Sequence, residues 1–353
     1  PAKAYREWID KYGDVVGYFN GYRPVILVAD VDLLRQIQIK DFNDFSDRGL
    51  LFQAKRPPSP HNKSLLQLTS TRWREVRSVL TPSFTTNKLR LMSPGIISAV
   101  EMLVAKIDQK AQTGEEFEAG EMYAALALDV ICKSAMGINY NLQEQPRHRF
   151  LVCCRLLFGC AFSFIAVLLT AFPGSAGLLQ FINFRLLRWQ NNGVHPFVEV
   201  QEKCKRIVEQ RQVDSSLRRK DLLQLMIDAK HTRVDMGSVQ TSQLMAAEDN
   251  DHELPDTMKS ETSSGGNQQA FSKGVLDDDD ITQNAFNVLV AGFETTSNTM
   301  ALVTHAMTHH PEVQEKMREE LLSVLGPYEQ ITYSTIQDLP YMNSVIQETM
   351  RLY

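Results

Sequence analysis

Apolar residues recur at helical spacing along most of the chain, and only one short stretch near the start reads as paired strands. We expect this β-hairpin over residues 15–28 with a turn at 20–23, flanked by short helices at 2–12 and 30–40. Further helices are expected at about 71–80, 87–111, 120–136, 146–160, 187–213, 219–230, 279–309, 311–325 and 339–353. The pattern predicts a mainly α protein with a small N-terminal β-sheet.

Residues 231–274 differ in composition from the rest of the chain. They hold mainly Ser, Thr, Asp, Glu, Asn and Gly, with few large apolar side chains. Such a segment cannot bury enough apolar surface to offset the entropy of ordering it. We therefore expect a disordered insertion before the long helix at 279–309, within a single partial domain that covers residues 1–353. The composition leaves two interpretations of this segment open, a neutral insertion and a regulatory segment.

Residues 156–184 contain no charged side chain, and the stretch is long enough to span a bilayer. Pro173, Gly174 and Gly177 interrupt it, however, and Gln180 and Asn183 add polar groups to its second half. We expect the end of a helix followed by a hydrophobic loop that is buried or lies at a membrane surface. A transmembrane helix is the alternative.

The net charge of −5 argues against a nucleic-acid-binding protein. The five cysteines are scattered without a C-x-x-C pair, which suits a reducing compartment better than a disulfide scaffold. Both ends look incomplete. The chain begins at Pro1 without an initiator methionine, and it stops at Tyr353 inside an apolar helical pattern with no capping residue. We expect a fragment of a longer protein.

Residues 291–296, with the sequence AGFETT, lie within the longest predicted helix. A glycine there costs about 1 kcal/mol relative to alanine, and an unpaired buried carboxylate costs more. Sequences break such local rules mostly at functional sites, so this segment is a candidate active-site wall. Gly292 would let a flat group approach the backbone, Thr295 and Thr296 can bond to carbonyls one turn earlier, and Glu294 could relay protons. A satisfied polar kink is the alternative.

Trp73 and Arg77 lie four residues apart, which places them on one face of a predicted helix. An indole N–H and a guanidinium together present donors to an anionic group such as a carboxylate. A surface aromatic–arginine pair is the alternative for this short motif.

Glu348 and Arg351 lie three residues apart on the last predicted helix. The spacing alone indicates only an ion pair. Because apolar residues surround the pair, we expect it to be buried within an apolar helix. A buried ion pair of this kind positions structural elements more than it stabilises the fold.

Taken in order, these three motifs resemble the cytochrome P450 family of haem-thiolate monooxygenases, and the resemblance runs over nearly the whole chain. Residues 291–296 match the family pattern [AG]-G-x-[DE]-T-[TS], and the segments LTPSF at 80–84 and HPEVQ at 310–314 are also similar. The similar branch is the microsomal one that contains drug-oxidising enzymes and thromboxane synthases. The resemblance implies the cytochrome P450 fold, with helices A to K present and both ends incomplete.

The resemblance implies that haem b is the cofactor and that four residues contact it. Trp73 and Arg77 would bind a haem propionate, and Ala291 and Gly292 would lie against the porphyrin and the oxygen site. The iron ligand of the family is a cysteine thiolate downstream of the E-x-x-R motif. All five cysteines here lie upstream, so we expect that ligand beyond Tyr353 and assign no metal ligand in this chain, which should not form a functional haem-thiolate centre alone.

The resemblance also gives roles to two further pairs. Glu294 and Thr295 would be catalytic, delivering protons for oxygen activation through a water-linked relay. Glu348 and Arg351 would be a structural pair that helps to lock the haem-binding core.

The function implied is insertion of one oxygen atom of O2 into a lipophilic small molecule, with electrons from NADPH through a cytochrome reductase. The enzyme would sit on the endoplasmic reticulum membrane, contact the membrane surface and face the cytosol. One alternative is an endoperoxide isomerase of the thromboxane-synthase type, although such enzymes tend to replace the threonine found here as Thr295 with an apolar residue. A non-catalytic helical membrane or scaffold protein is the other alternative.

Overall fold

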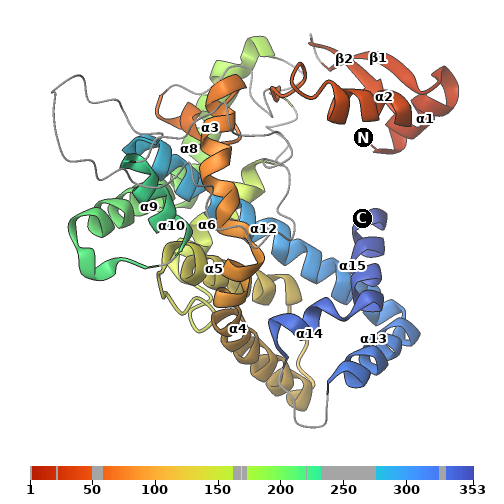
Figure 1. Cartoon of the computed structure of the whole chain (residues 1–353), viewed down its shortest axis with the longest axis vertical. Coiled ribbons are helices and arrows are strands. Elements are labelled where there is room, and N and C mark those ends of the chain that lie inside the picture. The colour runs from red at the N-terminus through yellow and green to blue at the C-terminus, as the bar shows by residue number, and fades with distance from the viewer. Residues whose placement is uncertain are drawn as a thin grey trace, which may run out of the picture. The chain divides into compact units, whose positions relative to one another are not determined.

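The computed structural model describes residues 2–20, 23–49, 59–161, 168, 173–219, 221–231, 276–325 and 331–353 (Figure 1). Contacts divide the chain into two units. The first contains Pro1–Glu75 and Cys153–Val200, and the second contains Val76–Val152 and Gln201–Tyr353. The expectation of one domain over residues 1–353 stays a prediction, and the expected insertion at 231–274 lies outside the described residues except for His231.

The predicted hairpin forms in the first unit. Strands β1 (Val15–Asn20) and β2 (Arg23–Val28) pair antiparallel, with Val15 opposite Val28. Helix α1 (Ala2–Tyr12) rests on this hairpin through an aromatic cluster, in which the ring centroids of Trp8 and Tyr18 lie 5.2 Å apart. The predicted helix at 30–40 forms as α2 (Val31–Arg35), with Asp30 as its N-cap, and continues as a π-helical turn at Gln36–Lys40.

The prediction of one helix over 187–213 is wrong. The structure has two helices, α8 (Ala176–Gln190) and α9 (Pro196–Val213). Asn192 and Gly193 between them adopt positive φ angles of 50° and 85°, a left-handed conformation that asparagine and glycine tolerate and that ends a right-handed helix. Pro196 then starts α9 at the position where a proline costs no helical hydrogen bond.

Most other predicted helices form close to their expected bounds. They are α3 (Ser70–Leu80), α4 (Thr86–Thr113), α5 (Ala119–Met136), α6 (Arg149–Ala161), α10 (Leu222–Asp228), α12 (Asp278–His309), α13 (Pro311–Val324) and α15 (Pro340–Leu352). The pattern missed the short helix α14 (Tyr333–Gln337), whose N-cap is Thr332. None of the described helices is long and apolar enough to cross a membrane. Within residues 156–184, the expected helix end forms as the end of α6, but the expected loop is wrong for residues 176–184, which belong to α8.

Helices α5 and α12 form the centre of the second unit, and α4 and α10 also pack against α5. The buried face of α12 includes Leu289, Phe293 and Ser297, which follow one another at four-residue spacing. The hydroxyls of Tyr123 on α5 and Thr304 on α12 lie 2.7 Å apart, which fixes the register between the two helices. At the start of α12, Asp277 and Asp280 form a reciprocal capping box, so the acidic run there serves the helix end.

A buried ion pair joins the ends of α5, α9 and α10. The guanidinium of Arg211 donates to the carboxylate of Asp221 at 2.5 Å and to the carbonyl of Met136 at 2.6 Å, which is one of the last carbonyls of α5. Asp221 also caps α10 by accepting from the backbone N–H of Gln224 at 2.9 Å. Gly137 has a φ angle of +63°, and a Cβ there would lie 2.5 Å from an Arg211 nitrogen. Only glycine fits beside this ion pair.

Helix α15 is fixed at its beginning by a side chain from α13. The carboxylate of Glu320 accepts the backbone N–H groups of Tyr341 at 2.7 Å and Met342 at 2.8 Å. These N–H groups have no acceptor within their own helix, so Glu320 acts as an N-cap supplied by another element.

Candidate active site on helix α12

Residues 291–296 lie in the second half of α12, which is helical without interruption from Asp278 to His309. Ala291, Thr295 and Asn298 are exposed and share one face of the helix. Glu294 is half-buried, and its carboxylate accepts from the side-chain amide of Asn298 at 3.4 Å. The expectation of polar groups buried inside an apolar helix is therefore wrong. Apolar side chains such as Phe293 occupy the buried face, and the hydroxyls line the open face.

The hydroxyl of Thr295 bonds back to the helix as expected. It donates to the carbonyl of Ala291 at 2.7 Å, and one turn later the hydroxyl of Thr299 donates to the carbonyl of Thr295 at 3.0 Å. Donation uses the only proton of the hydroxyl but leaves its oxygen able to accept. Thr295 therefore presents an oriented oxygen on the exposed face of α12.

Gly292 makes a close approach possible, and its neighbour there is a side chain of α5. A Cβ built on Gly292 would lie 3.0 Å from Cδ1 of Ile131 and 3.3 Å from its Cγ1. The glycine thus lets α12 pack tightly on α5. Contact of Gly292 and Ala291 with a porphyrin stays a prediction.

Replacing Gly292 with alanine is expected to destabilise the second unit by about 1 kcal/mol, since overpacking against Ile131 outweighs the gain in helix propensity. Ile131→Val removes the Cδ1 atom that the new methyl would meet at 3.0 Å. The double variant should therefore recover most of the loss, as measured by urea unfolding of both single variants and the pair. A double variant whose loss equals the sum of the single losses would show that the contact is not the cause.

Trp73 and Arg77 both lie on α3, as predicted, and both are half-buried. The Trp73 ring packs at 6.1 Å from the ring of Phe42, with an interplanar angle of 57°. Thr81 lies in the turn that follows the helix, and its hydroxyl donates to the backbone carbonyl of Arg77 at 2.9 Å. Their proposed contact with an anionic group stays a prediction.

Glu348 and Arg351 form the predicted ion pair on α15, but the expected apolar setting is wrong. Two nitrogens of Arg351 each donate to a carboxylate oxygen of Glu348 at 2.7 Å. The side chain of Arg351 is 67% exposed and that of Glu348 is 54% exposed. The pair lies open because α12 and α13, the helices that pack against α15, leave this face uncovered. The hydrogen bonds from Arg351 lower the pKa of Glu348. The role in locking a haem-binding core stays a prediction.

The cysteines with described side chains are chemically unlike metal-ligating thiolates. Cys132, Cys153, Cys154 and Cys204 are all buried. Burial raises the pKa of Cys132 far above its usual value and raises that of Cys204 to about 12. These two thiols are neutral at pH 7. Among the described residues, no group of three or more His, Cys, Asp or Glu side chains could hold a metal ion.

Comparison with known proteins places the whole chain in one family. The model of the family described as cytochrome P450 matches residues 1–353. Thromboxane-A synthase from Sus scrofa is 29% identical over 355 residues, which cover 99% of this chain and 64% of that protein. Cytochrome P450 3A6 from Oryctolagus cuniculus is 28% identical, over 97% of this chain and 60% of that protein. Probable cytochrome P450 6a18 from Drosophila melanogaster is 28% identical, over 99% of this chain and 62% of that protein. The chain spans about three fifths of the length of these relatives.

Proposed function

Because this chain belongs to the cytochrome P450 family, we propose that the complete protein is a haem-dependent monooxygenase that inserts one oxygen atom of O2 into a lipophilic small molecule. The mainly α fold with its small N-terminal sheet is the fold expected for this family. The observation that carries the proposed activity is the oriented hydroxyl of Thr295 beside Ala291 on the open face of α12.

The residues present suit one face and the edge of a haem group. Ala291 offers a small exposed side chain on α12, where a flat ring needs close approach. Trp73 and Arg77 on α3 provide N–H donors of the kind that bind a propionate. Cys132 and Cys204, by contrast, are buried neutral thiols, so we assign the iron ligand to neither of them.

Haem iron, when bound, supplies the redox centre at which O2 is reduced with electrons that a reductase takes from NADPH. The part of Thr295 is to hold a water that carries the proton, by accepting a hydrogen bond from it at Oγ1. The orientation of Oγ1 is fixed by its own donation to the Ala291 carbonyl 2.7 Å away. Glu294 is half-buried, so its carboxylate can exchange protons with solvent and pass them to water beside Thr295. We assign Glu294 and Thr295 to this relay.

An endoperoxide isomerase is the second candidate function, because the similar proteins include thromboxane-A synthases. Both candidates would use the same fold, but only a monooxygenase needs protons for oxygen activation. Thr295, which supplies such a proton path, favours the monooxygenase.

The dependence on a reductase tests the proposal. We expect the complete protein to convert lipophilic substrates only when NADPH, NADPH–cytochrome reductase and O2 are all present, and we expect isotopically labelled O2 to place one labelled atom in each product molecule. Endoperoxide rearrangement at full rate without the reductase, together with no labelled product, would instead establish the isomerase.

We also propose that the protein acts at the cytosolic face of the endoplasmic reticulum membrane. Helix α8 supports membrane contact, because Leu178, Phe181 and Trp189 on it are 65%, 61% and 80% exposed. Apolar and tryptophan side chains on one amphipathic helix are typical of a helix that lies in a membrane surface. Flotation of the complete protein with lipid vesicles tests this location, and failure to float would count against it.

A further inference from the structure

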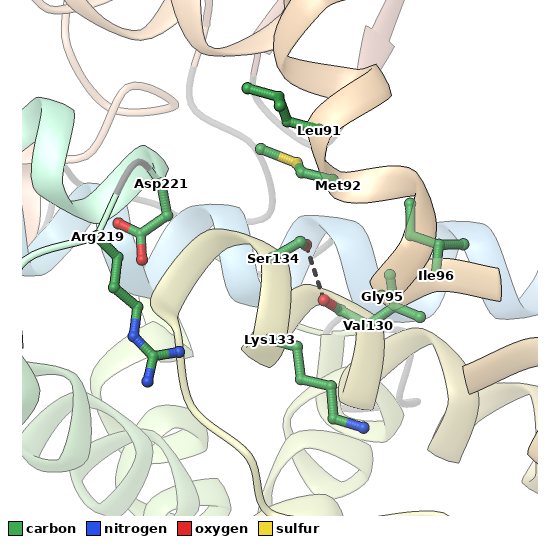
Figure 2. Close-up of a pocket in the computed structure, with 9 residues that line it drawn as sticks. All are labelled: Leu91, Met92, Gly95, Ile96, Val130, Lys133, Ser134, Arg219 and Asp221. Atoms are coloured by element: carbon green, nitrogen blue, oxygen red, sulfur yellow. Dashed lines mark hydrogen bonds between the residues drawn. The ribbon is translucent and has the colours of Figure 1, made fainter. Parts of the chain in front are cut away.

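A pocket of about 250 Å³ lies in the second unit between α4, α5 and the segment that leads into α10 (Figure 2). In its lining, Lys133 is paired with the carboxylate of Asp129 at 2.8 Å, and the hydroxyl of Ser134 donates to the carbonyl of Val130 at 2.7 Å. Figure 2 shows the guanidinium of Arg219 directed away from the apolar side chains of α4. These side chains therefore do not converge on a common ligand.

Two histidine side chains at the end of α12 do lie close together. His305 and His309 are four residues apart, which places them on one face of the helix, and both are exposed. Their ring centroids lie 4.4 Å apart, with an interplanar angle of 54°. Two nitrogens bound to one tetrahedral zinc ion lie about 3.4 Å apart, because each Zn–N distance is about 2.0–2.1 Å. The two rings are therefore close enough to supply one nitrogen each to the same ion.

The hydrogen bond of the His309 ring leaves a nitrogen available for a metal. Nδ1 of His309 lies 2.9 Å from the carbonyl of His305, and Nδ1 carries the proton because a carbonyl can only accept. In the neutral ring Nε2 then carries the lone pair that a metal needs. Histidines that bind metals almost always donate their other ring N–H to a carbonyl, a carboxylate or water in this way. His309 thus already has the tautomer of a metal ligand.

The ring of His305 is available as well. Among the residues that the structure describes, none forms a hydrogen bond with its ring nitrogens, and the ring of Tyr353 packs edge-on against it at a centroid distance of 6.3 Å. Both histidines lie in the last two turns of α12, which ends at His309. The C-terminal end of a helix carries the negative end of the helix dipole, so this position favours a bound cation.

We propose that His305 and His309 bind a divalent transition-metal ion such as Zn²⁺ through one imidazole nitrogen each. Imidazole suits zinc, copper and nickel, whereas magnesium and calcium prefer oxygen ligands. No third His, Cys, Asp or Glu side chain completes the site within the described ranges, so water fills the remaining positions. His305 lies more than two helical turns beyond Thr296. The proposal therefore does not depend on the proposed monooxygenase activity.

Titration calorimetry of the complete protein, purified without a histidine tag, with Zn²⁺ tests the proposal. We expect saturable Zn²⁺ binding that His305→Gln and His309→Gln each weaken about tenfold or more, because loss of even a group that only hydrogen-bonds to a metal ligand costs about 10–100-fold in affinity. His310→Gln is the matched control, since this exposed neighbouring histidine pairs with Glu312 at 3.2 Å. It should leave Zn²⁺ binding unchanged, and titrations with Mg²⁺ should not distinguish the parent protein from any variant.

Thermal unfolding gives a second readout that also detects a folding defect. Both histidines are exposed and glutamine is a good helix former, so without metal we expect the melting temperatures of His305→Gln and His309→Gln to match that of the parent protein. Zn²⁺ should raise the melting temperature of the parent protein and of His310→Gln more than that of either other variant, because a metal that binds only the folded state stabilises it. Three results would overturn the proposal: no saturable Zn²⁺ binding, binding that His305→Gln or His309→Gln leaves unchanged, or binding that His310→Gln weakens as much as they do.

Discussion

Replacing Arg211 with methionine is expected to lower the free energy of unfolding by about 3–5 kcal/mol, because the change leaves the carboxylate of Asp221 buried without its cation. Arg211 and Asp221 are only 7% and 8% exposed, and their charged atoms lie 2.5 Å apart. The substitution also removes the donor at 2.6 Å to the Met136 carbonyl at the end of α5. Urea unfolding of the complete protein followed by circular dichroism measures the loss.

Arg218→Met is the matched control for this prediction. Arg218 pairs with Asp228 at 3.0 Å, but the two side chains are 65% and 47% exposed, so the expected cost is about 1 kcal/mol or less. Combining Arg211→Met with Asp221→Asn should recover part of the loss, because the asparagine is neutral and its side-chain oxygen can still cap α10. If Arg211→Met costs no more than Arg218→Met, the buried pair is not the main support that we infer.

Thr295→Ala in the complete enzyme is expected to reduce the amount of product formed per NADPH consumed by about tenfold or more. The Thr295 hydroxyl, 2.7 Å from the Ala291 carbonyl, is the proposed acceptor that holds the proton-carrying water, and general acid–base groups contribute about 10²–10⁴-fold to rates. NADPH oxidation should continue while product formation falls, so the two quantities must be measured in the same reaction.

Two controls separate proton delivery from a change in helix structure. Thr295→Ser keeps a hydroxyl and should retain most of the coupling between NADPH oxidation and product formation. Thr299→Ala removes an equivalent back-bond, which reaches the Thr295 carbonyl at 3.0 Å one turn later, and should leave coupling nearly unchanged. Unchanged coupling in Thr295→Ala would remove Thr295 from the relay.

The sequence predicted the features that depend on local spacing. The hairpin at β1 and β2, the position of residues 291–296 on a long helix, and the Glu348–Arg351 ion pair all follow from periodicity or from i, i+3 and i, i+4 geometry. The break at Asn192 and Gly193 was also readable from residue types, but the helical pattern on both sides of it was stronger.

Features that depend on contacts between elements could not be predicted in this way. Which face of α12 or α15 is covered depends on neighbouring helices, so the exposure of Thr295 and Arg351 was not foreseen. Arg211 and Asp221 meet across a turn with no periodic relation, and nothing in the sequence near Arg211 distinguishes it from a surface arginine. The contact of Gly292 with Ile131 likewise joins residues far apart in the chain.

The attachment of Glu320 to the first N–H groups of α15 makes that end of the helix a pivot. The helix has 13 residues, so its far end lies about 20 Å from the pivot at a rise of 1.5 Å per residue. A small tilt of α15 about Glu320 would therefore move Tyr341 little and Arg351 several times farther. The ring of Tyr353 opposes such a tilt, because its centroid lies 6.3 Å from that of His305 on α12, so α15 is held by α13 at one end and by α12 at the other.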